Sequence, residues 1–295
     1  MSRLLITGSG GMLGRDLLAV LRSRSDLSVT ATTRADLDIT DPDAARAAVA
    51  GHDLVINTAA WTDVDGAEAQ ENAATAVNGD AVAHLARACA ATGTRMIHIS
   101  TDYVFRGDAT EPYSEDAATS PVNAYGRSKL AGELAVTQLL PDTGYIVRTA
   151  WLYGEHGPNF VATMLRLAEE REWLDVVDDQ WGQPTWSYRL AEQLVALTDA
   201  ALAGHASPGA YHGTASGATT WYGLARAVFT LRGLDPDRIR PTTSDRFRRP
   251  APRPTYSVLA HQRWATADLQ PLADWRSALA EAMAEAMARA PVRPS

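Results

Sequence analysis

Lysine is almost absent from this sequence: of its 27 Lys and Arg residues, only Lys129 is a lysine. In a chain that prefers arginine so strongly, we expect lysine where arginine cannot serve, because the lysine ammonium is compact and sits on a flexible stem. Lys129 follows Tyr125 by four residues in an apolar-periodic segment, 124–140, that is predicted to be helical. The two side chains should therefore lie one turn apart on one helix face. The alternative is a surface lysine beside a half-buried tyrosine.

Cysteine is equally scarce, since Cys89 is the only one and cannot form an internal disulfide. We expect it to be a small core residue. No apolar run approaches the roughly 18 residues of a membrane span, and no charged leader with a cleavage site is evident, so a cytoplasmic protein is expected. The net charge of -8 disfavours nucleic acid as a partner, because nucleic-acid-binding proteins carry a basic face. The seven histidines show no ligand spacing, so neither a metal site nor a metal hydrolase is predicted.

Short apolar strands alternate with helical segments over the first half of the 295-residue chain. This alternation predicts an α/β fold with a Rossmann-type, doubly wound parallel sheet. Beyond residue 155 the pattern loosens into a smaller, mixed lobe. We therefore predict a dinucleotide-binding domain over residues 1–154 and a mainly substrate-binding C-terminal lobe over 155–295, with return segments to the first domain left open.

A glycine-rich turn stands between the first predicted strand, 2–7, and the first predicted helix, 12–21. Gly8, Gly11 and Gly14 have the spacing of a dinucleotide-binding turn, in which glycine lets the backbone approach a pyrophosphate and the helix N-terminus meets its charge. The position of the turn between strand and helix strengthens the prediction. The alternative is a turn that merely caps a helix.

The second predicted strand, 27–32, leads to Arg34, where an NAD-specific site would present an acidic residue. Arginine can pair with a 2′-phosphate, so NADPH is favoured, with NADH as the alternative cofactor. Arg34 as a solvated side chain is the competing interpretation. Asp38 and Ile39 are placed to border the adenine. Small residues after the strand 53–58 leave room for a cofactor at Ala59, Ala60, Trp61 and Thr62.

Two further polar positions in this half can be interpreted structurally or functionally. Asp65 with Glu68 three residues later is predicted to form a capping box, with a substrate role as the alternative. Asn78 lies among alanines and valines in a long predicted helix, 72–92, where its amide would interrupt the backbone ladder and hold a water, or be exposed. At 100–105, Ser-Thr-Asp-Tyr-Val-Phe follows a strand, and hydroxyls at the carboxyl end of a parallel strand lie where open α/β sheets bind ligands. Thr101 could otherwise satisfy a local N–H.

Together the glycine turn, Asn-Thr-Ala-Ala at 57–60, the 100–105 segment and the Tyr125/Lys129 pair resemble the extended short-chain dehydrogenase/reductase superfamily. Within it, the segments 61–68 and 179–185 and Arg253-Pro254 followed by Ser257 resemble the dTDP-4-dehydrorhamnose reductase family. The resemblance covers nearly the whole chain. It implies that an NAD(P)H-dependent oxidoreductase reduces the 4-keto group of dTDP-4-dehydro-L-rhamnose to give dTDP-L-rhamnose.

The resemblance also implies roles for individual residues. The catalytic residues would be Thr101, Tyr125 and Lys129. The cofactor would be held by Gly8, Gly11, Met12, Leu13, Gly14, Arg34, Asp38, Ile39, Ala59, Ala60, Trp61, Thr62, Asn78, Tyr125 and Lys129. The dTDP-sugar would be met by Thr101, Asp102, Tyr103, Trp151 and Arg253. Trp61 departs from the family, which often has a smaller or imidazole side chain there, and Asp16 is the one candidate for the metal that links subunits in some relatives. We predict no such metal, and a monomer or homodimer.

The expected mechanism follows from charge, because hydride arriving at a carbonyl carbon builds an alkoxide that an acid must protonate. Tyr125 is expected to be that acid, with its pKa lowered by the Lys129 ammonium and the oxidised nicotinamide. Lys129 would also hold the nicotinamide ribose, Thr101 would donate to the substrate oxygen, and Asn78 would keep a water that returns the proton.

Other activities of the superfamily compete with this prediction. A dehydratase is disfavoured, since Asp102 is followed by Tyr103 rather than by a second acid. An epimerase would use the same Tyr and Lys but would not consume NADPH. A non-catalytic regulatory subunit should have lost the Thr101, Tyr125 and Lys129 set. The exact 4-keto sugar stays open, since a streptose-type or other antibiotic deoxysugar precursor needs the same residues.

Overall fold

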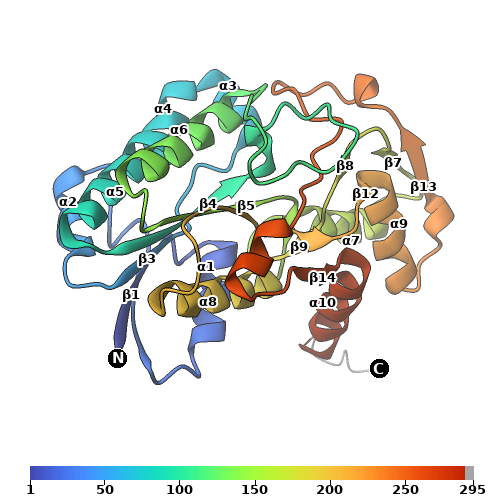
Figure 1. The fold of residues 1–295 in the computed structure, drawn as a ribbon. Helices are drawn as coiled ribbons and strands as arrows, with labels where there is room; N and C mark the ends of the chain where they lie inside the picture. Colours follow the sequence, from blue (N-terminus) through green and yellow to red (C-terminus); the bar gives the residue numbers. More distant parts are fainter. Residues whose placement is uncertain (290–295) are drawn as a thin grey trace.

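The protein has two lobes, and the larger is built on a parallel sheet of six strands (Figure 1). The computed structural model describes residues 1–289. The strand order is β2-β1-β3-β4-β5-β10. These strands span Leu27–Thr32, Ser2–Thr7, Leu54–Asn57, Arg95–Thr101, Gly144–Thr149 and Gly209–His212. The order reverses between β1 and β3, which is the point where open α/β sheets bind ligands at the carboxyl ends of their strands. The predicted doubly wound fold is thereby confirmed.

Helices cover both faces of the sheet, and two buried clusters fill the space between. On one face lie α2 (Pro42–Val49), α5 (Ala81–Thr92) and α6 (Ala124–Leu139), packed on Leu5, Val55 and their neighbours. On the other face α1 (Met12–Leu21) packs beside α8 (Ser187–Leu202). Because α8 and β10 belong to the second half of the sequence, that half returns to the large sheet and completes it.

The smaller lobe has its own core and short two-stranded sheets. Its helices are α7 (Phe160–Glu170), α9 (Trp221–Leu231) and α10 (Trp275–Arg289), and they pack around a cluster that includes Phe229 and Trp275. The paired strands are β6 (Leu152–Tyr153) with β9 (Thr185–Trp186), β7 (Leu174–Val177) with β13 (Ile239–Thr242), β8 (Trp181–Gly182) with β12 (Thr219–Thr220), and β11 (Ala215–Ser216) with β14 (Leu272–Asp274). Pairing is parallel except between β8 and β12, so this lobe is mixed.

The structure refines one sequence-based expectation about local structure and contradicts another. The segment expected to be helical over 72–92 is helical without a gap as α4 (Glu71–Thr75), a π-helical turn (Ala76–Asp80) and α5, and its backbone ladder changes at the turn that contains Asn78. The predicted capping box is not formed, because Asp63 caps α3 (Val64–Ala69) by accepting from Gly66 N. Beyond β13, a short 3₁₀ turn (Ser244–Arg246) follows.

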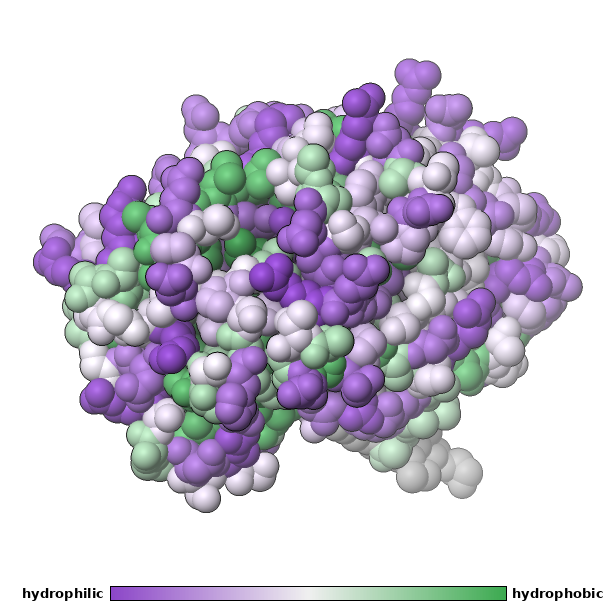
Figure 2. Space-filling view, viewed as in Figure 1, coloured by the Kyte–Doolittle hydropathy of each residue, from purple (hydrophilic) through white to green (hydrophobic). Residues whose placement is uncertain are grey.

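The surface in view is mostly hydrophilic, with hydrophobic residues in separate small patches (Figure 2). Exposed large apolar side chains such as Leu134, Trp181 and Phe247 are scattered over different elements. Among residues 1–289, no helix combines the length and the apolarity that crossing a bilayer requires.

Candidate active site

The glycine turn after β1 is shaped by backbone contacts on both sides. Gly8 has φ +72°, and a Cβ atom there would fall 2.5 Å from the backbone N of Ala59. A Cβ on Gly14 would fall 2.6 Å from Gly8 O. Both glycines therefore serve close packing of α1 and β3 against the turn, which brings the exposed Gly11 to the end of α1.

The N-terminus of α1 is available to an anion. Gly11 occupies the N-cap position, and within the described chain no side chain makes a capping hydrogen bond there. The first N–H groups of a helix lack intrahelical partners, and the positive end of the helix dipole lies beside them. Leu13 is buried in the core, so only its backbone can meet a pyrophosphate. Met12 is half-buried at the same end.

The residues predicted to border the adenosine lie in the segment between β2 and α2. Arg34 is exposed, and its charge helps to lower the pKa of Asp38. The Asp38 carboxylate also accepts from Thr40 N at 3.0 Å and from Thr40 Oγ1 at 2.7 Å, so it shapes the entry to α2. Ile39 is buried in the core below α2. Arg34 is thus the freely accessible cation at this edge, whereas Ile39 offers mainly its backbone.

Asn78 holds the segment after β3 in place. Its Oδ1 accepts from Trp61 N at 2.9 Å, and its Nδ2 donates to Trp61 O at 3.0 Å and to Ser128 Oγ at 2.9 Å. The amide lies in the π-helical turn and is fully buried. It therefore links the half-buried residues Ala59, Ala60 and Trp61, and the exposed Thr62, to the helix that carries Tyr125.

Thr101 and Tyr125 come together at the carboxyl end of β4. Thr101 Oγ1 accepts from Tyr103 N at 3.2 Å and donates to Asp102 Oδ1 at 2.9 Å. The Thr101 hydroxyl also lies close enough to the Tyr125 hydroxyl to affect its pKa. Glu68 fixes the start of α6, since its Oε1 accepts from Ala124 N at 2.7 Å. Thr101 at the end of β4, Asp102 directly after it and Tyr125 on α6 thus bring two hydroxyls and one carboxylate together.

Burial controls the protonation of this group in the cofactor-free protein. Burial, helped by the negative charge of Asp102, raises the pKa of Tyr125, and the Thr101 hydroxyl only partly opposes this shift. The lowering of this pKa by Lys129 and the oxidised nicotinamide concerns the protein with bound cofactor and stays a prediction. Burial likewise raises the pKa of Asp102 to about 6, against the hydroxyls of Ser257 and Thr101.

Lys129 lies one turn further along α6, deep below the site. Its side chain is 2% exposed, and Nζ donates to Ile99 O at 2.6 Å. Nζ also lies 3.4 Å from His98 Nε2. Burial lowers the pKa of Lys129 to about 8, while the Glu133 carboxylate acts in the opposite direction.

Tyr103 and Arg253 form a second wall of the site. The Tyr103 ring meets the Tyr125 ring edge to face, with centroids 6.0 Å apart. Arg253 lowers the pKa of Tyr103, although burial and Asp102 raise it overall. Arg253 Nη2 is paired with Asp65 Oδ2 at 3.0 Å. Asp65, expected to cap α3, instead anchors the loop that carries Arg253.

Trp151 lies on the side of the smaller lobe. It has φ +47°, a conformation rarely adopted by residues other than glycine. Its indole stacks on Trp221, with centroids 3.5 Å apart and planes 10° apart. Trp221 Nε1 donates to Gln180 Oε1 at 3.2 Å, and Gln180 Nε2 donates to Ser244 Oγ at 2.8 Å. The polar turn at 179–185 therefore supports the tryptophan stack.

Several residues that shape this site were not predicted from the sequence. His98 and Ser128 were not identified, and Asn57 was noted only as part of a family motif, although a histidine inside the apolar run Met-Ile-His-Ile was a usable signal. Trp221 and the Asp65–Arg253 pair were also missed. Trp221 contacts Trp151 and Arg253 contacts Asp65 across long stretches of sequence, so no local sequence pattern predicts these contacts.

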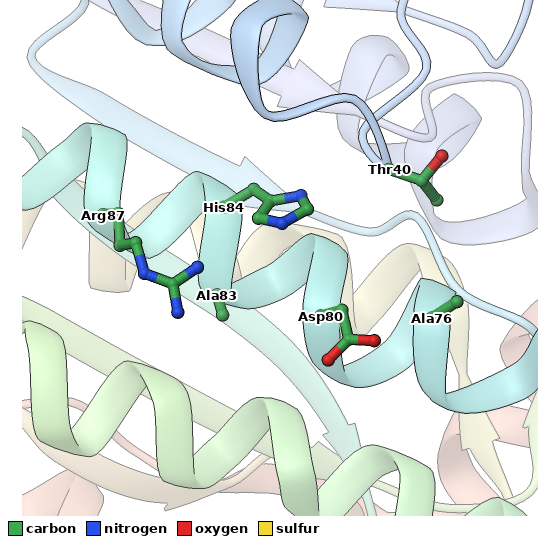
Figure 3. Close-up of a pocket in the computed structure, with 6 residues that line it drawn as sticks. All are labelled: Thr40, Ala76, Asp80, Ala83, His84 and Arg87. Carbon is green, nitrogen blue, oxygen red and sulfur yellow. The ribbon is translucent and has the colours of Figure 1, made fainter. Parts of the chain in front are cut away.

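Other cavities and clusters do not coincide with this group. A hollow of about 360 Å³ on the outer side of α5 is lined by Asp80, His84 and Arg87, with Thr40 facing them from the loop before α2 (Figure 3). None of these residues was predicted to bind a ligand.

In the part of the chain that the structure describes, His, Cys, Asp and Glu do not gather into a group of three or more that could hold a metal. The buried Asp16 carboxylate accepts from Ser187 Oγ.

Comparison with known proteins identifies the family. Residues 2–288 match the family model described as RmlD substrate binding domain. A dTDP-4-dehydrorhamnose reductase of Streptomyces griseus is 54% identical over 98% of this chain and 95% of its own. A dTDP-4-keto-6-deoxy-D-glucose reductase of Streptomyces niveus is 53% identical over 95% and 96%. The dTDP-4-dehydrorhamnose reductase of Bacillus anthracis, solved in complex with NADP, has a TM-score of 0.90 at 34% identity, covering 97% of this chain and all of that one. The chain therefore belongs to the RmlD family of dTDP-4-dehydrorhamnose reductases, as its motifs predicted.

Proposed function

We propose that this protein uses NADPH to reduce the 4-keto group of a dTDP-4-keto-6-deoxy-sugar, with dTDP-4-dehydro-L-rhamnose as substrate, dTDP-L-rhamnose as product and Tyr125 as proton donor. The observation that carries this proposal is the approach of two hydroxyls, those of Thr101 and Tyr125, at the carboxyl end of β4. Such a pair can bind and protonate one carbonyl oxygen.

The cofactor fits the residues at the adjoining edge of the sheet. The uncapped N-terminus of α1 suits a pyrophosphate, and the exposed Arg34 suits a 2′-phosphate. The B. anthracis relative in complex with NADP supports NADPH. When bound, NADPH supplies the hydride.

Tyr125 completes the reduction by giving its proton to the oxygen of the former ketone. One ketone, one hydride and one proton yield one alcohol. The raised pKa of Tyr125 suits this direction, because an acid must be protonated before it can donate, and the product alkoxide is a much stronger base than a phenolate. Thr101 can turn its O–H from Asp102 to the substrate oxygen, and Lys129 would hold the nicotinamide ribose.

Another dTDP-4-keto sugar is the second candidate substrate. The S. niveus relative, named for dTDP-4-keto-6-deoxy-D-glucose, is almost as similar to this chain as the S. griseus relative. Reduction of the ketone follows the same chemistry for both sugars. The preference for one sugar therefore depends on the side chains proposed to line the sugar site, Trp151 and Arg253.

The test is a panel of dTDP-4-keto-6-deoxy-sugars with purified protein and NADPH, followed by NADPH absorbance and by NMR of the product. We expect one NADPH to be consumed per sugar, fastest with dTDP-4-dehydro-L-rhamnose. A higher kcat/KM for another sugar would move the assignment to that sugar. Conversion of a sugar without net NADPH consumption would indicate an epimerase and overturn the proposal.

A further inference from the structure

A chain of buried polar side chains runs from the first strand of the sheet to Lys129. Thr7 Oγ1 donates to Asn57 Oδ1 at 2.6 Å, Asn57 Nδ2 lies 3.0 Å from His98 Nδ1, and His98 Nε2 lies 3.4 Å from Lys129 Nζ. All four residues are at most 2% exposed. The four residues belong to β1, β3, β4 and α6. Lys129 Nζ is therefore linked to a buried polar chain that runs across the sheet.

The partners of Asn57 fix which nitrogen of His98 carries the proton. The backbone N–H of Ala59 donates to Asn57 Oδ1 at 3.2 Å, and a backbone N–H can only donate, so Oδ1 is the oxygen. The Asn57 amide nitrogen therefore faces His98 Nδ1 and donates to it. Burial and the neighbouring Lys129 hold the pKa of His98 well below its ordinary value. A neutral imidazole that accepts at Nδ1 carries its proton on Nε2.

His98 consequently presents an N–H to Lys129. An amine nitrogen can accept from it, whereas an ammonium has no lone pair and would meet the positive end of the N–H dipole. The other titratable or charged groups around this site are few: Glu133 on α6, which is paired with Arg148 of β5, and Asp102, Tyr103 and Tyr125 near the mouth. The Glu133 carboxylate favours the ammonium form of Lys129, whereas burial of Lys129 disfavours it.

A second buried histidine shows that this arrangement is not a general consequence of burial. His212 Nδ1 lies 2.8 Å from Ala260 O, which can only accept, so Nε2 is free to accept from Arg148 Nη1 at 3.3 Å. His212 thus offers a lone pair to its cation, while His98 offers a proton. Both side chains are fully buried. The unfavourable orientation occurs at the lysine of the active site.

We propose that His98 is a positioning residue whose Nε2–H disfavours the ammonium form of Lys129 in the free protein, so that binding of the nicotinamide cofactor is coupled to proton uptake at Nζ. This inference rests on the proposed function, because it requires the cofactor to bind beside Lys129. Ribose hydroxyls and the cofactor's negative phosphates would favour the charged amine. The affinity for NADPH should then fall as the pH rises, since the free protein loses the proton that the complex retains.

The chain itself permits a direct test, because its single lysine gives one side-chain signal. In untagged protein labelled with ¹³C at lysine Cε, we expect the free protein to titrate near pH 8 and the NADPH complex to titrate at least about one unit higher. His98→Asn keeps an acceptor for Asn57, and its shorter side chain no longer places an N–H at the position of Nε2 beside Lys129 Nζ, so it should raise the midpoint of the free protein. His212→Asn, the matched control, should leave it unchanged. A free wild-type midpoint near the ordinary value of about 10.4, or equal shifts in both variants, would overturn the proposal.

Binding calorimetry separates this proposal from the one on function. NADPH is titrated into wild-type protein at about pH 8.5, above the second pKa of about 6 of a phosphate monoester, in buffers of different ionisation enthalpy. We expect uptake of a large fraction of one proton, and a Kd that weakens by up to about tenfold per pH unit above pH 8. NADPH binding without proton uptake would contradict the role of His98 and leave the proposed function intact. Failure of NADPH to bind at all would contradict the proposed function.

Discussion

Gly182 lies directly against Trp151, where an added Cβ atom would fall 2.5 Å from indole Cε2. The same indole stacks on Trp221 and belongs to a residue with φ +47°. A non-glycine residue in that region costs of order 1–3 kcal/mol, so the surrounding packing must impose the conformation. Gly182 and Trp221 together therefore fix the ring of Trp151, which is predicted to meet the sugar.

Gly182→Ala should impair sugar binding while leaving cofactor binding intact. A contact of 2.5 Å cannot be tolerated, so Trp151 has to move, whereas the close neighbours of Gly8 are Thr58 and Ala59. We expect kcat/KM for the dTDP-sugar to fall about tenfold, corresponding to about 1.4 kcal/mol. Steady-state kinetics and an NADPH titration measure the two effects separately.

Trp151→Phe, measured alone and combined with Gly182→Ala, provides the control. A smaller ring relieves the collision, so the double variant should lose less than the sum of the two single losses, as expected for residues in contact. Wild-type kinetics for Gly182→Ala would show that the position of Trp151 does not matter to the reaction.

Tyr125→Phe should abolish most turnover and preserve NADPH binding. Removal of a general acid typically costs about 10²- to 10⁴-fold in rate, and the ring itself is retained. Tyr103→Phe is the matched comparison, because its ring packs against Tyr125. We expect this second variant to change KM more than kcat. A Tyr125→Phe enzyme with near wild-type kcat would rule out the proton-donor assignment.

The parts of the fold and site that could be predicted depend on residues near one another in the sequence. The glycine turn after β1, the hydroxyl segment after β4 and the Tyr125/Lys129 pair on α6 are all local patterns, and the structure contains them at the expected elements. The parallel sheet followed from the alternation of strands and helices. These features need no knowledge of distant contacts.

The errors arose where a distant partner decides the outcome. Asp65 fits a capping box, but Asp63 takes the cap and Asp65 pairs with Arg253, far along the chain. The backbone of Trp61 engages Asn78 within a π-helical turn that periodicity does not predict. The burial that raises the pKa of Tyr125 in the cofactor-free protein is likewise a property of the folded protein that no local pattern predicts.

Asp102→Asn should stabilise the protein at neutral pH, because burial raises the carboxyl pKa to about 6 from its usual value of 3.8. Between these two values the folded state binds more protons than the unfolded state, so the stability of the wild type falls as the pH rises from about 4 to 6. Above pH 6 the buried, ionised Asp102 lowers the free energy of unfolding of the wild type by its full amount, about 3 kcal/mol.

The pH dependence distinguishes this effect from a simple packing change. The stability advantage of Asp102→Asn over wild type should be largest above about pH 7 and should vanish near pH 4. Urea denaturation at a series of pH values measures it. A constant difference across this range would show that titration of Asp102 is not the cause.

Glu133→Gln should destabilise the fold strongly, because it leaves the buried Arg148 guanidinium without its counter-charge. Arg148 Nη2 and Glu133 Oε2 are 2.8 Å apart, with side chains 7% and 4% exposed. Breaking a buried pair on one side costs about 3–5 kcal/mol. Glu170→Gln removes the same charge from the exposed Arg166–Glu170 pair and should cost at most about 0.5 kcal/mol. Urea denaturation of both variants checks the difference; equal losses would mean that the Arg148–Glu133 pair contributes no more than a surface pair.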